Sequence, residues 1–166
     1  MEKYMGSPGV EDPHVIIRPE THSWGVEFVE RPEEADCVVL WLIPNTGGLF
    51  GSAGEEIRNE LSRNNIEVAY VNWIKAMKPT VVAINFSNPW VIGEIDNEDL
   101  HSVLATFGTT TDALLDVLSG RFAPTGRLPF SIPASAEAVQ SNRADLPGAM
   151  EEEGYAVFDF GGGISY

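Results

Sequence analysis

Two nearly uninterrupted apolar segments constrain the fold of this chain more than any other feature. Residues 36–43 read DCVVLWLI and residues 80–86 read TVVAINF. A strand with one wet face alternates apolar and polar residues, whereas neither segment alternates, so each is expected to be buried on both faces. Strands of this kind are typical of a parallel sheet covered by helices, which indicates an α/β fold.

The segments between and after these strands carry helix signals. Residues 66–77 place Tyr70, Trp73 and Met77 at helical spacing, and Lys78-Pro79 is a stop signal, so we expect a helix that ends there. Residues 103–107 predict a third strand. Thr111 is expected to cap a helix that runs from Asp112 through Leu118 and is terminated by Gly120. Its buried face is predicted to comprise Ala113, Leu114, Val117 and Leu118.

The remaining patterns are shorter. Strands are expected over 14–18 and 24–29, a surface helix over 55–64, and an aromatic segment over 155–160; the rest from residue 123 to 148 is predicted to be loop-rich. The alternation of strands and helices favours a three-layer α/β/α sandwich with a mostly parallel sheet. No linker long enough to divide the chain is evident, so residues 1–166 are interpreted as one domain.

Charge and composition exclude several classes of partner. The 166 residues include 25 acids and 10 bases, a net charge of −15, which repels nucleic acids and anionic membranes. No segment approaches the roughly 20 apolar residues of a membrane helix. The N-terminal MEKYMGSPGV lacks the apolar core of a signal peptide, so we expect a cytoplasmic chain, while a longer parent enzyme is compatible with secretion. A single cysteine, Cys37, excludes an internal disulfide.

No motif in the sequence requires a cofactor or a metal. The glycine-rich segment 46–54 follows the first apolar strand, but it matches neither nucleotide-binding pattern, and Glu55 and Glu56 would repel a phosphate. We therefore interpret it as a flexible connection. The spacings H-E-x-x-H and C-x-x-C are absent, as is the serine motif G-x-S-x-G. The expectation is no cofactor and no metal.

Several acids and tryptophans are candidates for a site. Acids that follow strands or open helices, where sites of α/β proteins gather, are Glu55, Glu94, Asp96 and Asp112. Acids at such positions are more often helix caps or solvated charges than members of a site. Exposed indoles stack on sugar faces, but the positions of Trp41 and Trp73 favour the core for both.

Three motifs in the second half resemble the carboxyl-terminal domain of glycoside hydrolase family 3. Residues 78–90 contain KPTVVAIN followed by SNPW, and residues 115–130 read LDVLSGRFAPTGRLPF, which is similar to that family's D-V-L-x-G-x-x-N-P-S-G-K-L-P-V/F signature. Residues 160–166, FGGGISY, resemble its F-G-x-G-L-S-Y closure. The resemblance covers residues 36–166 well and the first 35 residues poorly.

The resemblance implies a six-stranded α/β sandwich that sits behind a TIM barrel. In that family an Asp on the barrel is the nucleophile, and the sandwich supplies one side of the sugar pocket and, in many members, the general-acid Glu. The acid loop E-G-x-D-R and the loop Y-P-G-Q-E-G-G are both altered here, the second to residues 107–113. Glu55 is our candidate acid/base residue, and Trp90 and Asp112 are candidate substrate-binding residues.

Two functions from different classes follow. The first is a carboxyl-terminal sandwich domain or fragment of a β-glucosidase-like family 3 glycosidase, which is inactive alone because 166 residues leave no room for a barrel of roughly 250. The alternative is a stand-alone α/β module that binds carbohydrate or protein without catalysis. Whether the chain alone is an enzyme stays open. The expected partners are the barrel of a parent glycosidase or a second copy of the chain, with a sugar as ligand.

Overall fold

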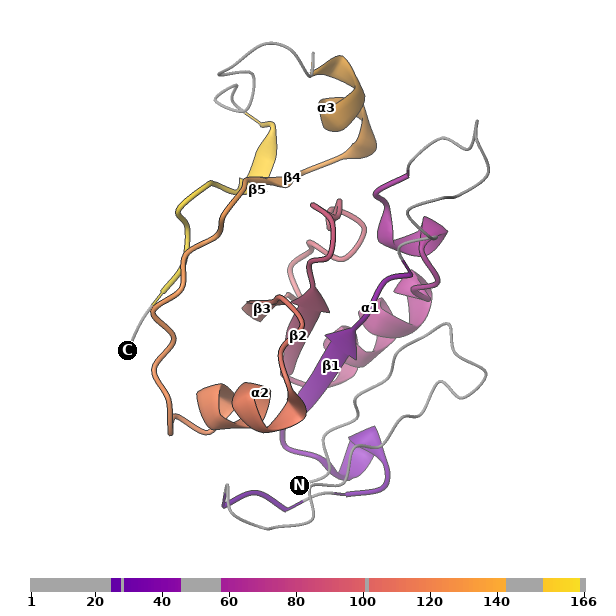
Figure 1. The fold of residues 1–166 in the computed structure, drawn as a ribbon. Helices are drawn as coiled ribbons and strands as arrows, with labels where there is room; N and C mark the ends of the chain where they lie inside the picture. The colour runs from indigo at the N-terminus through magenta and orange to yellow at the C-terminus, as the bar shows by residue number, and fades with distance from the viewer. Residues whose placement is uncertain (1–24, 28, 46–57, 101, 143–153, 165–166) are drawn as a thin grey trace.

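The centre of the molecule is a parallel sheet of three strands, β1 (Val38–Leu42), β2 (Thr80–Asn85) and β3 (Ser102–Thr106), in the order β1-β2-β3. The computed structural model describes residues 25–27, 29–45, 58–100, 102–142 and 154–164. The register places Leu42 opposite Ile84 and Ile84 opposite Ala105. All five residues of β1 are buried, as its continuous apolar sequence predicts. The three expected strands are therefore confirmed (Figure 1).

Helices cover both faces of this sheet. On one face, Leu40 and Ile84 belong to the same buried cluster as Val71 and Ile74 of α1 (Val68–Met77). On the other face, Trp41 and Ala83 pack against Leu114 of α2 (Thr111–Leu118), and Figure 1 shows the two helices on opposite sides of the strands. The expected three-layer α/β/α arrangement is confirmed by these contacts.

Helix α1 ends where the sequence predicts. The N–H of Lys78 donates to the carbonyl of Ile74 at 3.0 Å, and Pro79 then prevents a further turn. Its exposure pattern differs from the expectation, however. Trp73 is 50% exposed and is not a core residue, whereas Lys75 is 2% exposed. The helix thus turns its indole outward and an ammonium group inward.

Helix α2 begins one residue earlier than predicted. The hydroxyl of Thr110, not Thr111, accepts a hydrogen bond from the N–H of Ala113 and is the N-cap. Gly120, with φ of +75°, follows the helix end as expected. The predicted buried face is partly wrong, because Leu114 and Leu115 are the buried residues and Ala113 is exposed.

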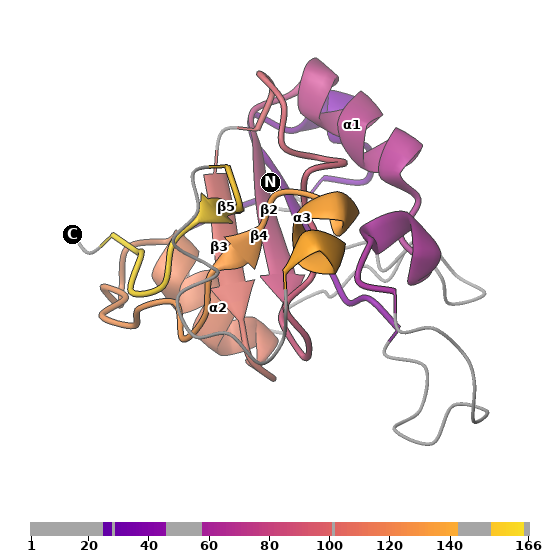
Figure 2. The same ribbon diagram turned by 90° about the horizontal axis from the view of Figure 1, so that it is seen from above.

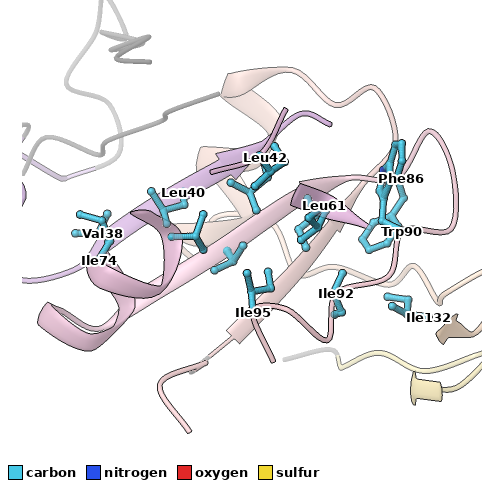
Figure 3. Close-up of a cluster of buried hydrophobic side chains, with 14 of the residues drawn as sticks. Val38, Leu40, Leu42, Leu61, Ile74, Phe86, Trp90, Ile92, Ile95 and Ile132 are labelled. Carbon is cyan, nitrogen blue, oxygen red and sulfur yellow. The ribbon is translucent and has the colours of Figure 1, made fainter. Parts of the chain in front are cut away.

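Most of the core lies on the α1 face (Figure 3). Beyond the strands and α1, it recruits side chains from the connection that follows β2, namely Phe86, Trp90, Ile92 and Ile95. Leu61 reaches it from a short 3₁₀ helix, η2 (Leu61–Arg63), and Ile132 from the C-terminal part of the chain. This face therefore joins segments that are far apart in the sequence.

The C-terminal part forms a two-stranded antiparallel ribbon of β4 (Ile132–Pro133) and β5 (Ala156–Phe158), which is drawn above the parallel sheet in Figure 1 and across β2 and β3 in Figure 2. The helix α3 (Ala136–Ser141) follows β4 and was not expected from the sequence. At Gly93 a Cβ atom would lie 2.2 Å from the carbonyl oxygen of Ala134. The ribbon thus approaches the β2–β3 connection too closely for any side chain at this position.

Several other expectations need correction. Residues 58–64 form no α-helix; they contain η2, and Glu60 makes a parallel bridge with Val91. The described residues between 25 and 29 are not a strand, and near them only the 3₁₀ helix η1 (Pro32–Glu34) forms.

The predicted strand over 14–18 and the glycine-rich segment 46–54 lie outside the described residues. No helix of the described residues is long and apolar enough to cross a membrane.

Candidate functional site at the carboxyl edge of the sheet

The carboxyl ends of β1, β2 and β3 meet at one edge of the sheet because the strands are parallel. Ile43–Asn45 leaves β1 there, Phe86 leaves β2 and Phe107 leaves β3. The N–H of Phe86 donates to the carbonyl of Thr106 at 2.8 Å, which extends the pairing of the two strands by one residue. Sites of α/β proteins are expected at this edge of the sheet.

Hydrogen bonds from Asn85 and Thr106 fix the turns at this edge. The side-chain oxygen of Asn85 accepts from the N–H of Gly108 at 2.9 Å. The hydroxyl of Thr106 donates to the carbonyl of Ile84 at 3.2 Å and accepts from Nε1 of Trp41 at 3.3 Å. Trp41 crosses from β1 toward β3 over the small side chain of Ala83, which lies between them in the sheet. It is a core residue, as expected.

The candidate Trp90 is packed inside this edge. Its indole is 1% exposed, belongs to the core cluster of the α1 face, and donates through Nε1 to the carbonyl of Asn85 at 2.9 Å. Figure 3 shows it beside Phe86 at the end of the core. Neither ring face is open to a ligand, so its position does not support the substrate-binding role, which stays a prediction.

Three phenylalanines from separate segments form a cluster at the same edge. The rings of Phe86 and Phe130 lie 5.8 Å apart, and that of Phe107 lies 6.3 Å from Phe86 and 6.1 Å from Phe130, edge-on to the latter. Phe86 is buried, but Phe107 is 52% exposed. Sequence reasoning missed this cluster, since 21 or more positions separate its members and no local pattern joins them.

The acidic candidates are distributed unevenly around the sheet. Asp112 is exposed in the first turn of α2, directly after the turn that follows β3. Glu94 accepts a hydrogen bond from the N–H of Ser62 at 3.0 Å and so holds η2, while Asp96 is exposed on the β2–β3 connection. Glu55 lies outside the described residues. The structure therefore places one of the candidate site residues, Asp112, in the open at the carboxyl edge.

A buried lysine marks a different part of the fold. Nζ of Lys75 donates to the carbonyl of Ile95 and to the side-chain oxygen of Asn97, the latter at 2.8 Å. Burial lowers the pKa of Lys75, and the nearby carboxylates of Asp99 and Asp96 oppose that shift. The amine ties α1 to the β2–β3 connection and contributes no group to the carboxyl edge.

At the carboxyl edge, the described residues offer aromatic rings and an exposed carboxylate. Hydrolysis of a glycosidic bond uses two carboxyl groups about 5–10 Å apart. Asp112 is an exposed carboxylate with Phe107 on the preceding turn, and Asp116 follows it one turn further along α2. Among the described residues, no three His, Cys, Asp or Glu side chains gather into a metal site.

Comparison with known proteins agrees with the motifs in the second half of the chain. The glycosyl hydrolase family 3 C-terminal domain model matches residues 4–166, so the match begins well before the motifs. A probable β-glucosidase C from Aspergillus flavus is 37% identical over 145 residues, and a β-glucosidase C from Emericella nidulans is 39% identical over 106. These alignments cover 87% and 64% of this chain.

The relatives are much longer than this chain. The matched regions make up 22% of the Aspergillus flavus protein and 16% of the Emericella nidulans protein. Among solved structures, a β-glucosidase from Listeria innocua in complex with isofagomine superposes with a TM-score of 0.59 over 81% of this chain and 21% of that one, at 24% identity, which supports the fold. The chain belongs to the C-terminal domain family of the family 3 glycosyl hydrolases.

Proposed function

We propose that this chain is the α/β domain of a β-glucosidase-like glycosidase and acts in the hydrolysis of O-glycosyl bonds only within a larger enzyme. The observation that carries the proposal is the family match over residues 4–166, together with relatives named β-glucosidase of which the chain spans about a fifth. By itself the domain is expected to be silent, because the chain spans only 22% of the Aspergillus flavus β-glucosidase C relative and the rest of the catalytic machinery is assigned to the remaining length.

In this proposal the domain presents its carboxyl edge to the reacting sugar. Glu55 is the candidate general acid, on the segment that follows β1, and Asp112 is the candidate for hydrogen bonding to substrate hydroxyls. Both segments start at the same edge of the sheet, which supports their assignment to one pocket. The nucleophile and the rest of the pocket are assigned to the remainder of the enzyme.

The proposal is tested first on the chain alone. The purified protein is incubated with nitrophenyl β-glucoside, β-xyloside and β-N-acetylglucosaminide, and no release of nitrophenol above the buffer rate is expected. Turnover that disappears in Glu55→Gln would overturn the assignment of the chain as a dependent domain. The variant is the necessary control, because turnover that survives it points to a contaminating glycosidase.

A stand-alone carbohydrate-binding module is the second candidate, and the exposed face of α1 favours it. The indole of Trp73 is 50% exposed and its centroid lies 5.8 Å from the ring of Tyr70. Tyr70 is partly buried against the core, so the half-exposed indole is the side chain that offers a face to a sugar ring. Calorimetric titration with cello- and xylo-oligosaccharides separates the two candidates: heat that is lost in Trp73→Ala supports the module, and absence of heat across the panel removes it.

A further inference from the structure

We infer that Phe107 is a stacking platform for the pyranose ring of a β-glucoside at the carboxyl edge of the sheet. The inference rests on the proposed function and adds to it a binding residue that the sequence motifs do not mark. Three observations support it: the position of the Phe107 ring, the contacts that hold the ring, and the exposure of its outer side.

The position of Phe107 is set by the sheet. It is the first residue after β3, at the edge where all three parallel strands end and where ligands of α/β folds bind. The N–H of the next residue, Gly108, is held by the side chain of Asn85 at 2.9 Å, and Gly108 adopts φ of +70°. The turn that carries the ring is therefore fixed by β2 and does not depend on the ring itself.

The ring is also held from the side. Phe130 meets it edge-on at 6.1 Å and Phe86 lies at 6.3 Å, and these two rings are themselves 5.8 Å apart. Contacts of this kind between aromatic rings stabilise one orientation. A platform that is already oriented loses little conformational entropy when a ligand stacks on it.

The outer side of the ring is open. Phe107 is 52% exposed, although its ring lies beside those of Phe86 and Phe130. A Cβ atom added to Gly108 would meet no atom within 4 Å, so the turn that follows Phe107 is open at that position. Asp112 is exposed in the first turn of α2, five residues after Phe107, and adds a hydrogen-bond acceptor.

These features match the chemistry of a pyranose. Such a ring has an apolar face of C–H groups and a rim of hydroxyls, which suits a flat aromatic side chain with a few polar groups near it. The same half-exposed ring would also suit a protein surface. The presence of an acceptor and the open turn beside the ring favour the sugar, and the protein partner is an outcome that the experiment separates.

The test follows the amide signals of the full chain by NMR during titration with methyl β-glucoside. Saturable shifts are expected at Phe107 and Gly108. Phe107→Leu keeps an apolar side chain against Phe86 and Phe130 but removes the flat ring, and it is expected to weaken binding about tenfold. Phe107→Tyr keeps the ring and is expected to bind within about twofold of the parent.

Phe122→Ala is the matched control, because it removes another exposed phenylalanine, 59% accessible, that lies after α2. It should leave the dissociation constant unchanged. Unchanged binding in Phe107→Leu, shifts centred on Trp73, or no saturable shift at the solubility limit of the glucoside would each overturn the inference. The turnover experiments on the proposed function do not involve Phe107, so the two can fail independently.

Discussion

The two faces of the sheet are stabilised in different ways. Among the described residues, the buried cluster on the α1 face has fifteen members, including residues from η2, the β2–β3 connection and β4. The buried cluster on the α2 face has three, Trp41, Ala83 and Leu114, and Trp41 adds a hydrogen bond to Thr106. The larger buried cluster therefore lies on the α1 face. The α2 face depends more on one large side chain, Trp41, which is both packed and hydrogen-bonded.

This contrast bears on the candidate site. The cluster of the α1 face continues into the carboxyl edge through Phe86 and Trp90, whereas the turn from β3 into α2 has Phe107 and Asp112 in the open. Cores are rigid because they are closely packed, and groups at their border are held without being covered. The side of the edge that leads to α2 is the side free to meet a ligand.

The largest expected effect is a loss of stability when a buried leucine is truncated, measured for one leucine from each face of the sheet. Leu40 and Leu114 are each 1% exposed, so Leu40→Ala and Leu114→Ala remove the same atoms from equally buried sites. We expect Leu40→Ala to lower the free energy of unfolding by about 4 kcal/mol, and Leu114→Ala by about 2.5 kcal/mol. A small cluster can collapse around the missing side chain more readily than a large one. Denaturant unfolding of both variants measures the difference.

Equal losses in the two variants would contradict the contrast between the faces. A larger loss at Leu114 would reverse it and assign the main core to α2. Parallel measurement of the denaturant slope is the control, since a changed slope would mean that the unfolded or folded ensemble, and not only the stability, differs.

A smaller effect is expected at the buried amine of α1. Lys75→Met keeps most of the side-chain volume but leaves the carbonyl of Ile95 and the amide of Asn97 without this donor, which is expected to cost about 1–2 kcal/mol near neutral pH. Lys78→Met, which removes a half-exposed lysine just after the same helix, should cost less than about 0.5 kcal/mol.

The contribution of Lys75 to the free energy of unfolding changes with pH in a defined direction. Because burial lowers the pKa of Lys75 in the folded state below 10.5, the unfolded state binds more protons between the two pKa values. Stability from this group therefore rises with pH in that window. The advantage of the parent over Lys75→Met should grow as the pH is raised toward 10.5; an advantage that shrinks would contradict the lowered pKa.

The smallest effect concerns the start of α2. Thr110→Ala removes the N-cap hydrogen bond to Ala113 and is expected to cost about 1 kcal/mol of unfolding free energy. Thr111→Ala changes the residue that the sequence pattern favoured as the cap, and its cost should stay below about 0.5 kcal/mol. If thermal unfolding shows the larger loss for Thr111→Ala, the helix begins one residue later than described.

The sheet and α1 could be predicted because their signals are local. The apolar segments over 36–43 and 80–86 fix two buried strands, and Lys78-Pro79 fixes the helix end whatever surrounds them. Residues 58–64 fail as a helix for a tertiary reason: the carbonyl of Asn59 accepts from the N–H of Val91 at 2.8 Å, and Asn64 closes the turn on the carbonyl of Glu60. An isolated bridge to Val91, which is distant in the sequence, overrides a weak helical pattern.

The site could be predicted only in outline. Its location at the carboxyl edge follows from parallel strands, and Asp112 was found because it opens a helix at that edge. Trp90 was selected for its indole, but its burial depends on Asn85 and on core side chains from other segments of the chain. Trp73 was expected in the core from helical spacing, yet the inward position on α1 is taken by Lys75, which finds acceptors on the β2–β3 connection.

The central claim is that this domain works only as part of a larger glycosidase, and a graft tests it most directly. The matched segment of the Aspergillus flavus β-glucosidase C relative, 145 residues, is replaced by this chain, and hydrolysis of nitrophenyl β-glucoside is measured beside the chain alone. We expect the graft to hydrolyse the glucoside and the graft carrying Glu55→Gln to lose this turnover. The chain alone is expected to show no turnover. A folded graft without turnover, or turnover by the chain alone that Glu55→Gln abolishes, would contradict it.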